Sequence, residues 1–575
     1  MENDQNSSDK PSNQEVDNSV EPQSTPPEPN PEGKPEEQPQ SPPSEPNPEE
    51  KSQESQQSRT PVSSNSPRTN KGLKIIVLVV IIIIAVIAGL YLYKHYNNKQ
   101  GAAAVIKKDI PVINVAFVYN PFNVFYPNDN FLEGPYEPDE QIFEGLVKFE
   151  NGTQIVPALA TSWTNPNDTT WVFKLRPNVK FHDGDTLTAQ DVVYTWQYLT
   201  KNSPNICAIA CTTIKNVQAL NNQTVQITTY SPDAILLNRL ASLWIIDSKA
   251  PAGTQPWELG TGAYTVKPGT TPNANTLHLV AFNNWWGGHA YTRAVNYTFF
   301  ANTNNAVTAM QKGEDNVADN VSLGQAATLK KDGFKEFDQP QLSTAVVSFY
   351  TQNPSYPTAN PKIREAFDLA LNPVAIMKAY DVKATLDDQP LPAGIPGYDP
   401  SITRPPLNLV QAAKLVKEAG YPNGVTITFG VGEPSLSAGQ EIAKELAPIG
   451  IHLKLEVATD EGTYFNNWNS GKYMIVFISQ NTVLTDGSDF LAYWDNQPYY
   501  NNPTLDSELN QANQTFNPTL RIKFLQEASQ TFVSDNAAIP LFNEYDVMMS
   551  KPNFVFPLGN YDQDMNVYFS SVYQK

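Results

Sequence analysis

Basic residues, histidines and cysteines are scarce in this chain. Its 575 residues include 39 Lys and Arg against 59 Asp and Glu, with 5 His and 2 Cys, and the formal net charge is −20. Nucleic-acid binding depends on clustered cationic side chains that displace the counterions of phosphates. The composition therefore excludes nucleic acid as a partner, while the length predicts several domains rather than one core.

The two cysteines, Cys207 and Cys211, have a C-x-x-x-C spacing. On a helix this spacing puts both on one face, within reach of a local disulfide in an oxidising compartment. The favoured interpretation is two small, half-buried side chains, and the disulfide stays open as the alternative. Two thiols alone make no zinc site and the histidines are scattered in sequence, so we expect no metal centre and no cofactor.

Sequence patterns of enzymes are also missing. The chain has no Gly-x-Ser-x-Gly elbow, no metal-binding His pair and no catalytic cysteine context. These patterns mark nucleophilic and metal-dependent hydrolases. We therefore expect a protein that is not an enzyme and has no catalytic residues.

Aromatic and branched apolar side chains are nearly absent from residues 1–70, which are rich in Glu, Pro, Ser, Gln and Asn. Such a segment cannot bury enough surface to offset its conformational entropy, so we predict a disordered tail. The segment Glu28–Lys34 recurs as Glu45–Lys51. Pro-rich spacing of this kind favours an extended spacer over a recruitment motif.

Charge is absent from the run Ile75–Tyr93. At about 1.5 Å per residue this run nearly spans a hydrocarbon core of roughly 30 Å. We predict a transmembrane helix over residues 73–94, followed by a linker over 95–110. Ala102–Ala104 would fit a signal-peptide cleavage site, but the apolar run is too long for a signal peptide, so we expect an uncleaved anchor. Positive charges balance on its two flanks and leave its orientation undecided.

The stretch Trp163–Tyr194 reads as a strand, a hairpin and a helix. Trp171, Phe173 and Leu175 alternate with polar or exposed positions, as in a strand that buries one face. The turn His182–Asp185 follows, and Thr188-Ala-Gln-Asp191 is typical of a capping box with Asp in the Glu position. We expect Trp163, Trp171, Trp285 and Trp286 in the core and no chemical role for His182.

This stretch and several others resemble, in order, the signature of the family 5 extracellular solute-binding proteins, the peptide- and nickel-type receptors of ABC importers. The other segments are Glu140–Val147 (E-Q-I-F-E-G-L-V), Pro157–Ala160, Gly260–Tyr264 (G-T-G-A-Y), Asn284–Gly288 (N-W-W-G-G), Gln311–Asp315, Pro361–Asn372 and Ala538–Phe542. In Pro361–Asn372 the residues Ile363, Ala366, Phe367 and Ala370 share one helical face, and Asn408 is the expected cap of a later helix. The resemblance covers about Ile113 to Tyr573.

The resemblance implies a two-lobed α/β clamp with an extra domain, of the periplasmic-binding-protein type, closing over a ligand between its lobes. We expect lobe one with the extra domain over residues 111–300, lobe two over 301–541 and a return to lobe one over 542–575. It further implies a receptor that binds a peptide or similar small solute and delivers it to the permease of an ABC importer. Since such receptors work outside the cytoplasmic membrane, the tail would be cytoplasmic and the chain a single-pass membrane protein held in the lipid bilayer.

The ligand contacts of the family's peptide receptors cluster on a segment of the form G-x-Y-D-x-x-R-x-G-W-x-x-D. Its Asp holds the α-ammonium of the peptide, and its backbone pairs with the ligand as an added strand. Here Gly471 and Tyr473 match, but the Arg, Trp and Asp are not kept, and Asp486 or Asp489 would have to supply the carboxylate. By position the resemblance implies these ligand-binding residues: Tyr136, Glu461, Trp468, Asn469, Phe477, Ser479, Gln480 and Asp486. Packing between lobes, or a surface loop, is the alternative for each.

Two other functions compete with transport. A protein that kept the solute-binding fold for surface interaction or signalling is favoured by the altered ligand segment and the long tail. A surface hydrolase is the weaker alternative, because no catalytic pattern supports it.

Overall fold

The computed structural model describes residues 107–575 apart from 119–136, 203–206, 208–209, 252, 255–257, 274, 482–483, 496 and 558–566. The predicted tail 1–70, the predicted membrane span 73–94 and most of the linker 95–110 lie outside the described residues. Within them, no helix has the length and apolar character needed to cross a bilayer.

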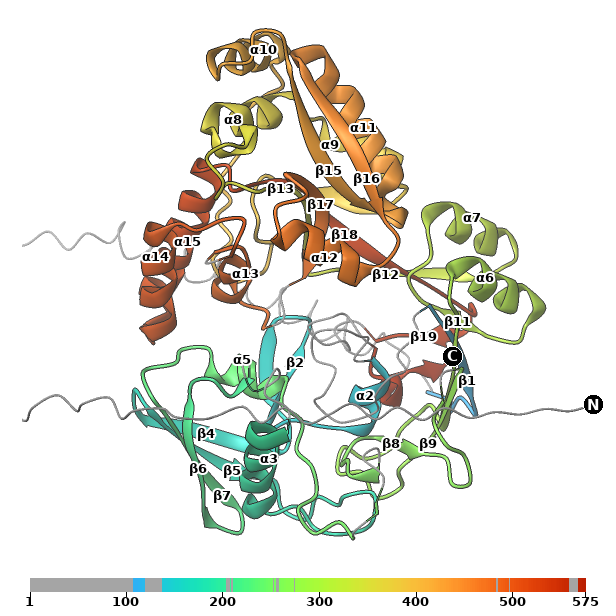
Figure 1. The fold of residues 1–575 in the computed structure, drawn as a ribbon. Helices are drawn as coiled ribbons and strands as arrows, with labels where there is room; N and C mark the ends of the chain where they lie inside the picture. The colour runs from blue at the N-terminus through green and yellow to red at the C-terminus, as the bar shows by residue number, and fades with distance from the viewer. Residues whose placement is uncertain are drawn as a thin grey trace, which may run out of the picture. The chain divides into compact units, whose positions relative to one another are not determined.

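A mixed sheet of 12 strands runs through the described chain in the order β16-β15-β17-β13-β18-β11-β1-β10-β9-β8, with β12 and β14 also on β18 (Figure 1). The strands are β1 Ile113–Phe117, β8 Tyr264–Val266, β9 Thr276–Ala281, β10 Ala294–Phe299, β11 Val317–Ala318, β12 Lys335–Pro340, β13 Ser343–Phe349, β14 Ala384–Leu386, β15 Val425–Gly432, β16 Ile451–Ala458, β17 Ile475–Asn481 and β18 Ala538–Ser550.

Strand β18 joins the two halves of this sheet. It pairs with β13 through residues 538–542 and with β12 through residues 545–550, and β11 pairs with its last two residues. A register shift between Ala345 and Val346 of β13 marks a bulge in the first pairing. Because successive strand residues point to opposite faces, this bulge changes which face the later residues of β18 occupy.

Helices cover both faces of the β13 half of the sheet. Those on one face are α8 Pro361–Ala370, α9 Pro373–Tyr380, α10 Leu409–Glu418 and α11 Leu436–Leu446, which share a core with β13, β15 and β17. Those on the other are α12 Glu461–Asn469, α13 Gly487–Trp494, α14 Pro503–Gln514 and α15 Pro518–Ser534. Ile363, Ala366, Phe367 and Ala370 are all buried in α8, and the Asn408 side chain caps α10, as the sequence predicts.

The β1 half carries α2 Glu137–Ile142, α6 Thr303–Lys312 and α7 Leu323–Lys331. A separate sheet of four antiparallel strands, β4-β5-β7-β6, packs against α3 Ala189–Asn202. Its strands are β4 Ala160–Asn167, β5 Thr170–Leu175, β6 Ile214–Asn221 and β7 Thr224–Thr229; beside it lie α5 Leu236–Ala241 and the pair β2 Val147–Glu150 and β3 Gln154–Pro157. The short pair β19 Phe554–Val555 and β20 Tyr573–Gln574 lies near the C-terminus.

The strand, turn and helix predicted over residues 163–194 are confirmed. Trp171, Phe173 and Leu175 are buried along β5 while their neighbours are not. Before α3, the Thr188 backbone N–H donates to Asp191 Oδ2 at 2.6 Å, which is one half of the predicted capping box. The other half is not formed, because the Asp191 N–H donates to the Thr188 backbone carbonyl at 3.1 Å rather than to the Thr188 hydroxyl.

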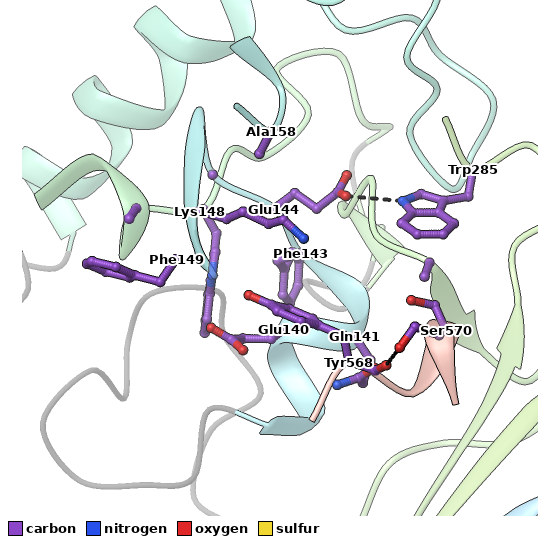
Figure 2. A pocket seen from close by; sticks show the side chains of 15 residues that line it. Glu140, Gln141, Phe143, Glu144, Lys148, Phe149, Ala158, Trp285, Tyr568 and Ser570 are labelled. Carbon is purple, nitrogen blue, oxygen red and sulfur yellow. Dashed lines mark hydrogen bonds between the residues drawn. The ribbon is translucent and has the colours of Figure 1, made fainter. Parts of the chain in front are cut away.

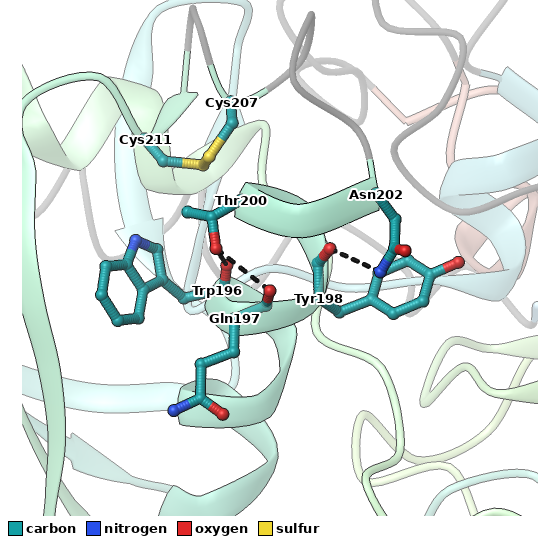
Figure 3. The surroundings of a disulfide bond; sticks show 7 residues. All are labelled: Trp196, Gln197, Tyr198, Thr200, Asn202, Cys207 and Cys211. Carbon is teal, nitrogen blue, oxygen red and sulfur yellow. Dashed lines mark hydrogen bonds between the residues drawn. A yellow bond between two sulfur atoms is a disulfide. The ribbon is translucent and has the colours of Figure 1, made fainter.

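Cys207 and Cys211 are joined by a disulfide, so the favoured interpretation of two unpaired side chains was wrong. The Cys211 N–H donates to the Cys207 carbonyl at 3.0 Å, as in one helical turn, and the Cα atoms are 4.5 Å apart. The bond lies beyond the end of α3, near Trp196 and Thr200 (Figure 3).

Candidate ligand-binding site

One face of β18 carries two acids between two hydrophobic clusters. Phe542 belongs to the core of the β13 half, and Met548 belongs to the core of the β1 half. Glu544 and Asp546 lie between them in the strand, and alternation puts all four on one face. We call Glu544 and Asp546 the acidic face of β18.

Glu544 is a buried acid with few polar partners. Its Oε1 is enclosed by the protein, and the hydroxyl of Ser479 is the donor beside it. Burial raises the pKa of Glu544, and the hydrogen bond from Ser479 lowers it by less. No salt bridge to Glu544 is formed within the described chain, and burying a carboxylate without a cation is costly. Such a group is suited to a cationic or hydrogen-bond-donating ligand.

Asp546 is paired with a second acid. Its carboxyl group is hydrogen-bonded to Asp319, and burial raises the pKa of Asp319. Two carboxyl groups can share a hydrogen bond only when one of them is protonated. The acidic face therefore continues from Glu544 toward a pair of acids that holds a proton.

On the opposite face of β18, Asn543 has its hydrogen-bond partners within the protein. Asn543 accepts from the Thr344 hydroxyl at 2.8 Å and donates to Asp387, and Thr344 also donates to the Pro390 carbonyl. Burial raises the pKa of Asp387 to about 6, opposed by the hydrogen bond from Asn543. This network contrasts with Glu544, which is the next residue in the strand and whose side chain lies on the other face.

One of the predicted residues, Ser479, lies next to Glu544. Ser479 and Gln480 are half-buried on β17 and pair with Ala345 and Thr344 of β13. Alternation places Gln480 on the opposite face of the sheet from Ser479. The other neighbour of β17, β15, pairs with it only at Ile475 and Val476. Beyond Val476, β15 leaves that edge of β17 uncovered.

The remaining predicted residues are distributed between core and surface. Phe477 is buried edge-on against Tyr380. Trp468 is buried in the core beneath α12, with its ring stacked on Tyr499 at 4.0 Å between centroids. Glu461 and Asn469 are exposed at the two ends of α12. Tyr136 lies outside the described residues.

Asp486, offered by the sequence as a partner for a ligand ammonium, is engaged within the protein. It is 2% exposed, forms a 2.7 Å salt bridge with Arg521 and accepts from the Ser488 N–H at the start of α13. Asp489 accepts from the Leu484 N–H at 3.0 Å. Both carboxylates therefore order the loop before α13.

A cavity of about 170 Å³ lies beside α2 and β2 (Figure 2). Glu144 borders it and accepts from Trp285 Nε1 at 3.1 Å, Trp286 Nε1 at 2.7 Å and Thr261 Oγ1 at 2.8 Å. Lys148 lies over the Tyr568 ring, 4.5 Å from its centroid. Burial raises the pKa of Glu144, and its indole and hydroxyl donors lower it by less. Both carboxylate oxygens of Glu144 are therefore already engaged within the protein.

Sequence reasoning missed Glu544 and Asp546. The signal was present: the apolar strand from Ala538 to Met549 is interrupted by N-E-Y-D at positions 543–546. Acids inside an otherwise apolar strand are costly unless they are paired or functional.

Comparison with known proteins gives a consistent result. A family model described as "Bacterial extracellular solute-binding proteins, family 5 Middle" matches residues 154–502, more than half of the chain. "Heme-binding protein A" of Haemophilus influenzae is 29% identical over 361 residues, which cover 56% of this chain and 65% of that protein. "Glutathione-binding protein GsiB" of Escherichia coli O157:H7 is 25% identical over 488 residues, covering 77% of this chain and 90% of that protein.

A similar solved structure is the periplasmic binding protein DppA from Helicobacter pylori in complex with the peptide STSA. It superposes with a TM-score of 0.69 at 23% identity, over 81% of this chain and 98% of that one. At this identity the likeness concerns the fold, a mixed α/β architecture of the two-lobed periplasmic-binding type.

Proposed function

This chain belongs to family 5 of the bacterial extracellular solute-binding proteins, and on that premise we propose that it captures a peptide or similar small solute for an ABC importer. Its relatives are named for binding, not for catalysis. The solute would lie against the acidic face of β18 and the end of β17, and the permease would receive it from there.

The observation that carries this proposal is the buried carboxylate of Glu544, for which the described residues supply no salt bridge and no donor beyond the Ser479 hydroxyl. A buried carboxylate is retained without a protein partner where an incoming cation or donor completes it. We infer that the solute carries an ammonium or guanidinium group that pairs with Glu544. Because Asp486 is neutralised by Arg521, Glu544 would replace the Asp that holds the peptide ammonium in related receptors.

The rest of the solute would bind along β17. The edge of β17 beyond Val476 is not covered by β15, and an extended peptide can add to such an edge through its backbone. Ser479 and Gln480 would then contact the solute directly. The other predicted residues would lie around this strand or support it by packing. They are Tyr136, Glu461, Trp468, Asn469, Phe477 and Asp486.

We also propose that residues 73–94 anchor the protein to the membrane, with the solute-binding part outside the cell and the tail inside. The charge-free run Ile75–Tyr93 supports this. Alkaline extraction of membranes checks it: the full chain should stay in the pellet, and a chain lacking residues 1–98 should be released. Release of the full chain would overturn the anchor.

The binding test uses the full chain purified in detergent. Native mass spectrometry should reveal a co-purified solute, and titration calorimetry against matched peptides with Lys, Gln or Glu at one position should favour Lys. Glu544→Gln should remove that preference, at a cost of roughly 1.5–3 kcal/mol for a charge-assisted bond. Glu418→Gln, on an exposed surface pair with Lys362, is the matched control and should bind as the parent does.

An interaction or signalling role is the second candidate. It is favoured by the engagement of Asp486 and Asp489 inside the loop before α13, since the segment that holds ligand in related receptors is used for structure here. Affinity capture with the full chain discriminates the two: transport predicts recovery of permease subunits, and this alternative predicts a scaffold partner and no bound solute.

A further inference from the structure

Three carboxylates meet in a part of the chain that the solute-binding proposal does not use. Asp183 and Asp185 lie in the exposed turn after β5, and Asp247 lies in the segment that follows α5. One carboxylate oxygen of each lies within 4.8 Å of the others. Like charges this close repel one another unless something balances them.

Asp247 is the buried member of the cluster. It is 2% exposed, and its buried Oδ2 has no N–H or O–H donor among the described residues, while the carboxyl group of Asp183 is its polar neighbour. Its Oδ1 accepts from the Lys249 N–H at 2.8 Å, which fixes the direction of the carboxylate.

The surrounding charges do not neutralise the cluster. Lys180 donates to the Gly184 carbonyl and the Thr186 hydroxyl, and Lys249 donates to the Thr186 carbonyl. No salt bridge joins either lysine to the three acids in the described part of the chain. Asp191 is close by, but its two oxygens are filled by Thr188 and Ser248.

The type of ligand fits hard divalent cations. Carboxylate oxygens are the ligands that Ca²⁺ and Mg²⁺ prefer, and three of them lie within 4.8 Å of one another here. Mg²⁺ demands near-ideal octahedral geometry and dehydrates reluctantly, whereas Ca²⁺ accepts irregular sets of oxygens. Three carboxylates from two separated segments therefore suit Ca²⁺ better, with water completing the coordination.

We propose that Asp183, Asp185 and Asp247 form a binding site for a divalent cation of the Ca²⁺ type. The site lies in the turn that starts at His182, whose Nε2 is 3.1 Å from the Gly262 carbonyl. A cation there ties the exposed turn to the buried segment around Asp247. This is a structural site, and it does not depend on whether the protein transports a solute.

The test uses the full chain in detergent, stripped with EGTA and dialysed. Calorimetric titration with CaCl₂ should show one site, and the melting temperature should rise by several degrees at saturating Ca²⁺ because the ion binds only the folded state. MgCl₂ at the same concentration should give a smaller rise. Absence of both the Ca²⁺ heat and the melting shift in the parent protein overturns the proposal.

Two variants keep the test decisive. Asp247→Asn retains the acceptor for the Lys249 N–H but removes the buried charge, so it should melt higher than the stripped parent and lose the Ca²⁺ response. Asp185→Asn, at an exposed position, should fold normally and bind Ca²⁺ at least tenfold more weakly. Asp332→Asn, an exposed acid at the end of α7, is the control and should respond as the parent does. Undiminished Ca²⁺ binding by both cluster variants would place the ion elsewhere and refute the site.

Discussion

At the scale of single residues, Glu144 explains why several distant sequence segments carry the family's pattern. It comes from the segment Glu140–Val147 and accepts hydrogen bonds from Thr261 and from both Trp285 and Trp286. Arg176 lies over the Trp286 ring, 3.9 Å from its centroid. Segments far apart in the sequence thus meet at one buried carboxylate, which needs its donors because a buried charge without them is costly.

Replacing Glu144 by Gln should therefore destabilise the protein. Gln offers one acceptor oxygen in place of two, so one indole N–H would face an amide N–H. We expect a loss of about 1–3 kcal/mol in the free energy of unfolding, measured by urea denaturation. Glu150→Gln, at an exposed position in β2, should change little. Equal stability of the two variants would show that the indoles do not depend on the carboxylate.

Asp139 makes the stability of the folded protein depend on pH, in a direction that follows from its raised pKa. Burial raises its pKa to about 8, and its Oδ1 has no hydrogen-bond partner among the described residues. The folded state then binds a proton that the unfolded state releases near pH 4, so this residue's contribution to stability is present below pH 4 and is lost as the pH rises toward 8. Asp139→Asn should raise the melting temperature at pH 8 and leave it unchanged at pH 4; the same shift at both values would contradict the assignment.

At the scale of elements, the disulfide closes a very short loop. The entropy gained by cross-linking grows with loop length, so for Cys207 and Cys211 it amounts to about 2 kcal/mol or less. The variant with both cysteines changed to Ser should lose no more than that in chemical denaturation. Alkylation followed by mass spectrometry checks the bond itself, because both thiols should react only after reduction.

Helices and strands whose apolar residues recur at a regular spacing could be predicted from the sequence. Elements without such a regular spacing could not. The alternation in β5 and the apolar stripe of α8 each follow from burial of one face, which local sequence records. The capping role of Asn408 is equally local. In the candidate site, Ser479 and Gln480 were found by position in the ligand segment, and their binding role stays a prediction.

The parts of the candidate site that could not be predicted depend on contacts between residues that are far apart in the sequence. Asp486 resembles a free ligand-binding acid until Arg521, on α15, is known to contact it. Glu544 becomes notable only when β18 and β17 are placed on either side of β13 in the sheet. The three acids of the proposed cation site come from two separated segments, so their approach is invisible in sequence spacing.

At the scale of the whole described chain, three contacts link the four-stranded sheet region to the loop and helices around α13 and α14. Asn238 donates to the Leu484 carbonyl at 2.8 Å, the Ala234 N–H donates to the Asn513 carbonyl at 2.8 Å, and the Trp171 and Phe516 ring centroids are 5.9 Å apart. Contacts of this kind would have to break if the two regions separate to admit a solute.

Removing two of them should favour the separated arrangement. The double variant Asn238→Ala, Phe516→Ala keeps the backbone hydrogen bond of Ala234 but loses an amide donor and a ring contact, worth roughly 1–2 kcal/mol together. We expect a larger radius of gyration by small-angle scattering, with helical content unchanged by circular dichroism. Asn466→Ala, at an exposed position in α12, should leave the scattering curve as it was. An unchanged radius in the double variant would show that these contacts do not control separation.

The position of β18 in the chain has a consequence for biosynthesis. Both halves of the large sheet need this strand, yet it spans residues 538–550 and follows β11 by more than 200 residues. A ribosome adding about 5–20 residues per second needs roughly 10–45 s to reach it from β11. Until then β13 and β11 each lack their neighbour on one side, so neither half can reach its final form. A nascent chain built in this way keeps both halves of the sheet incomplete over that interval.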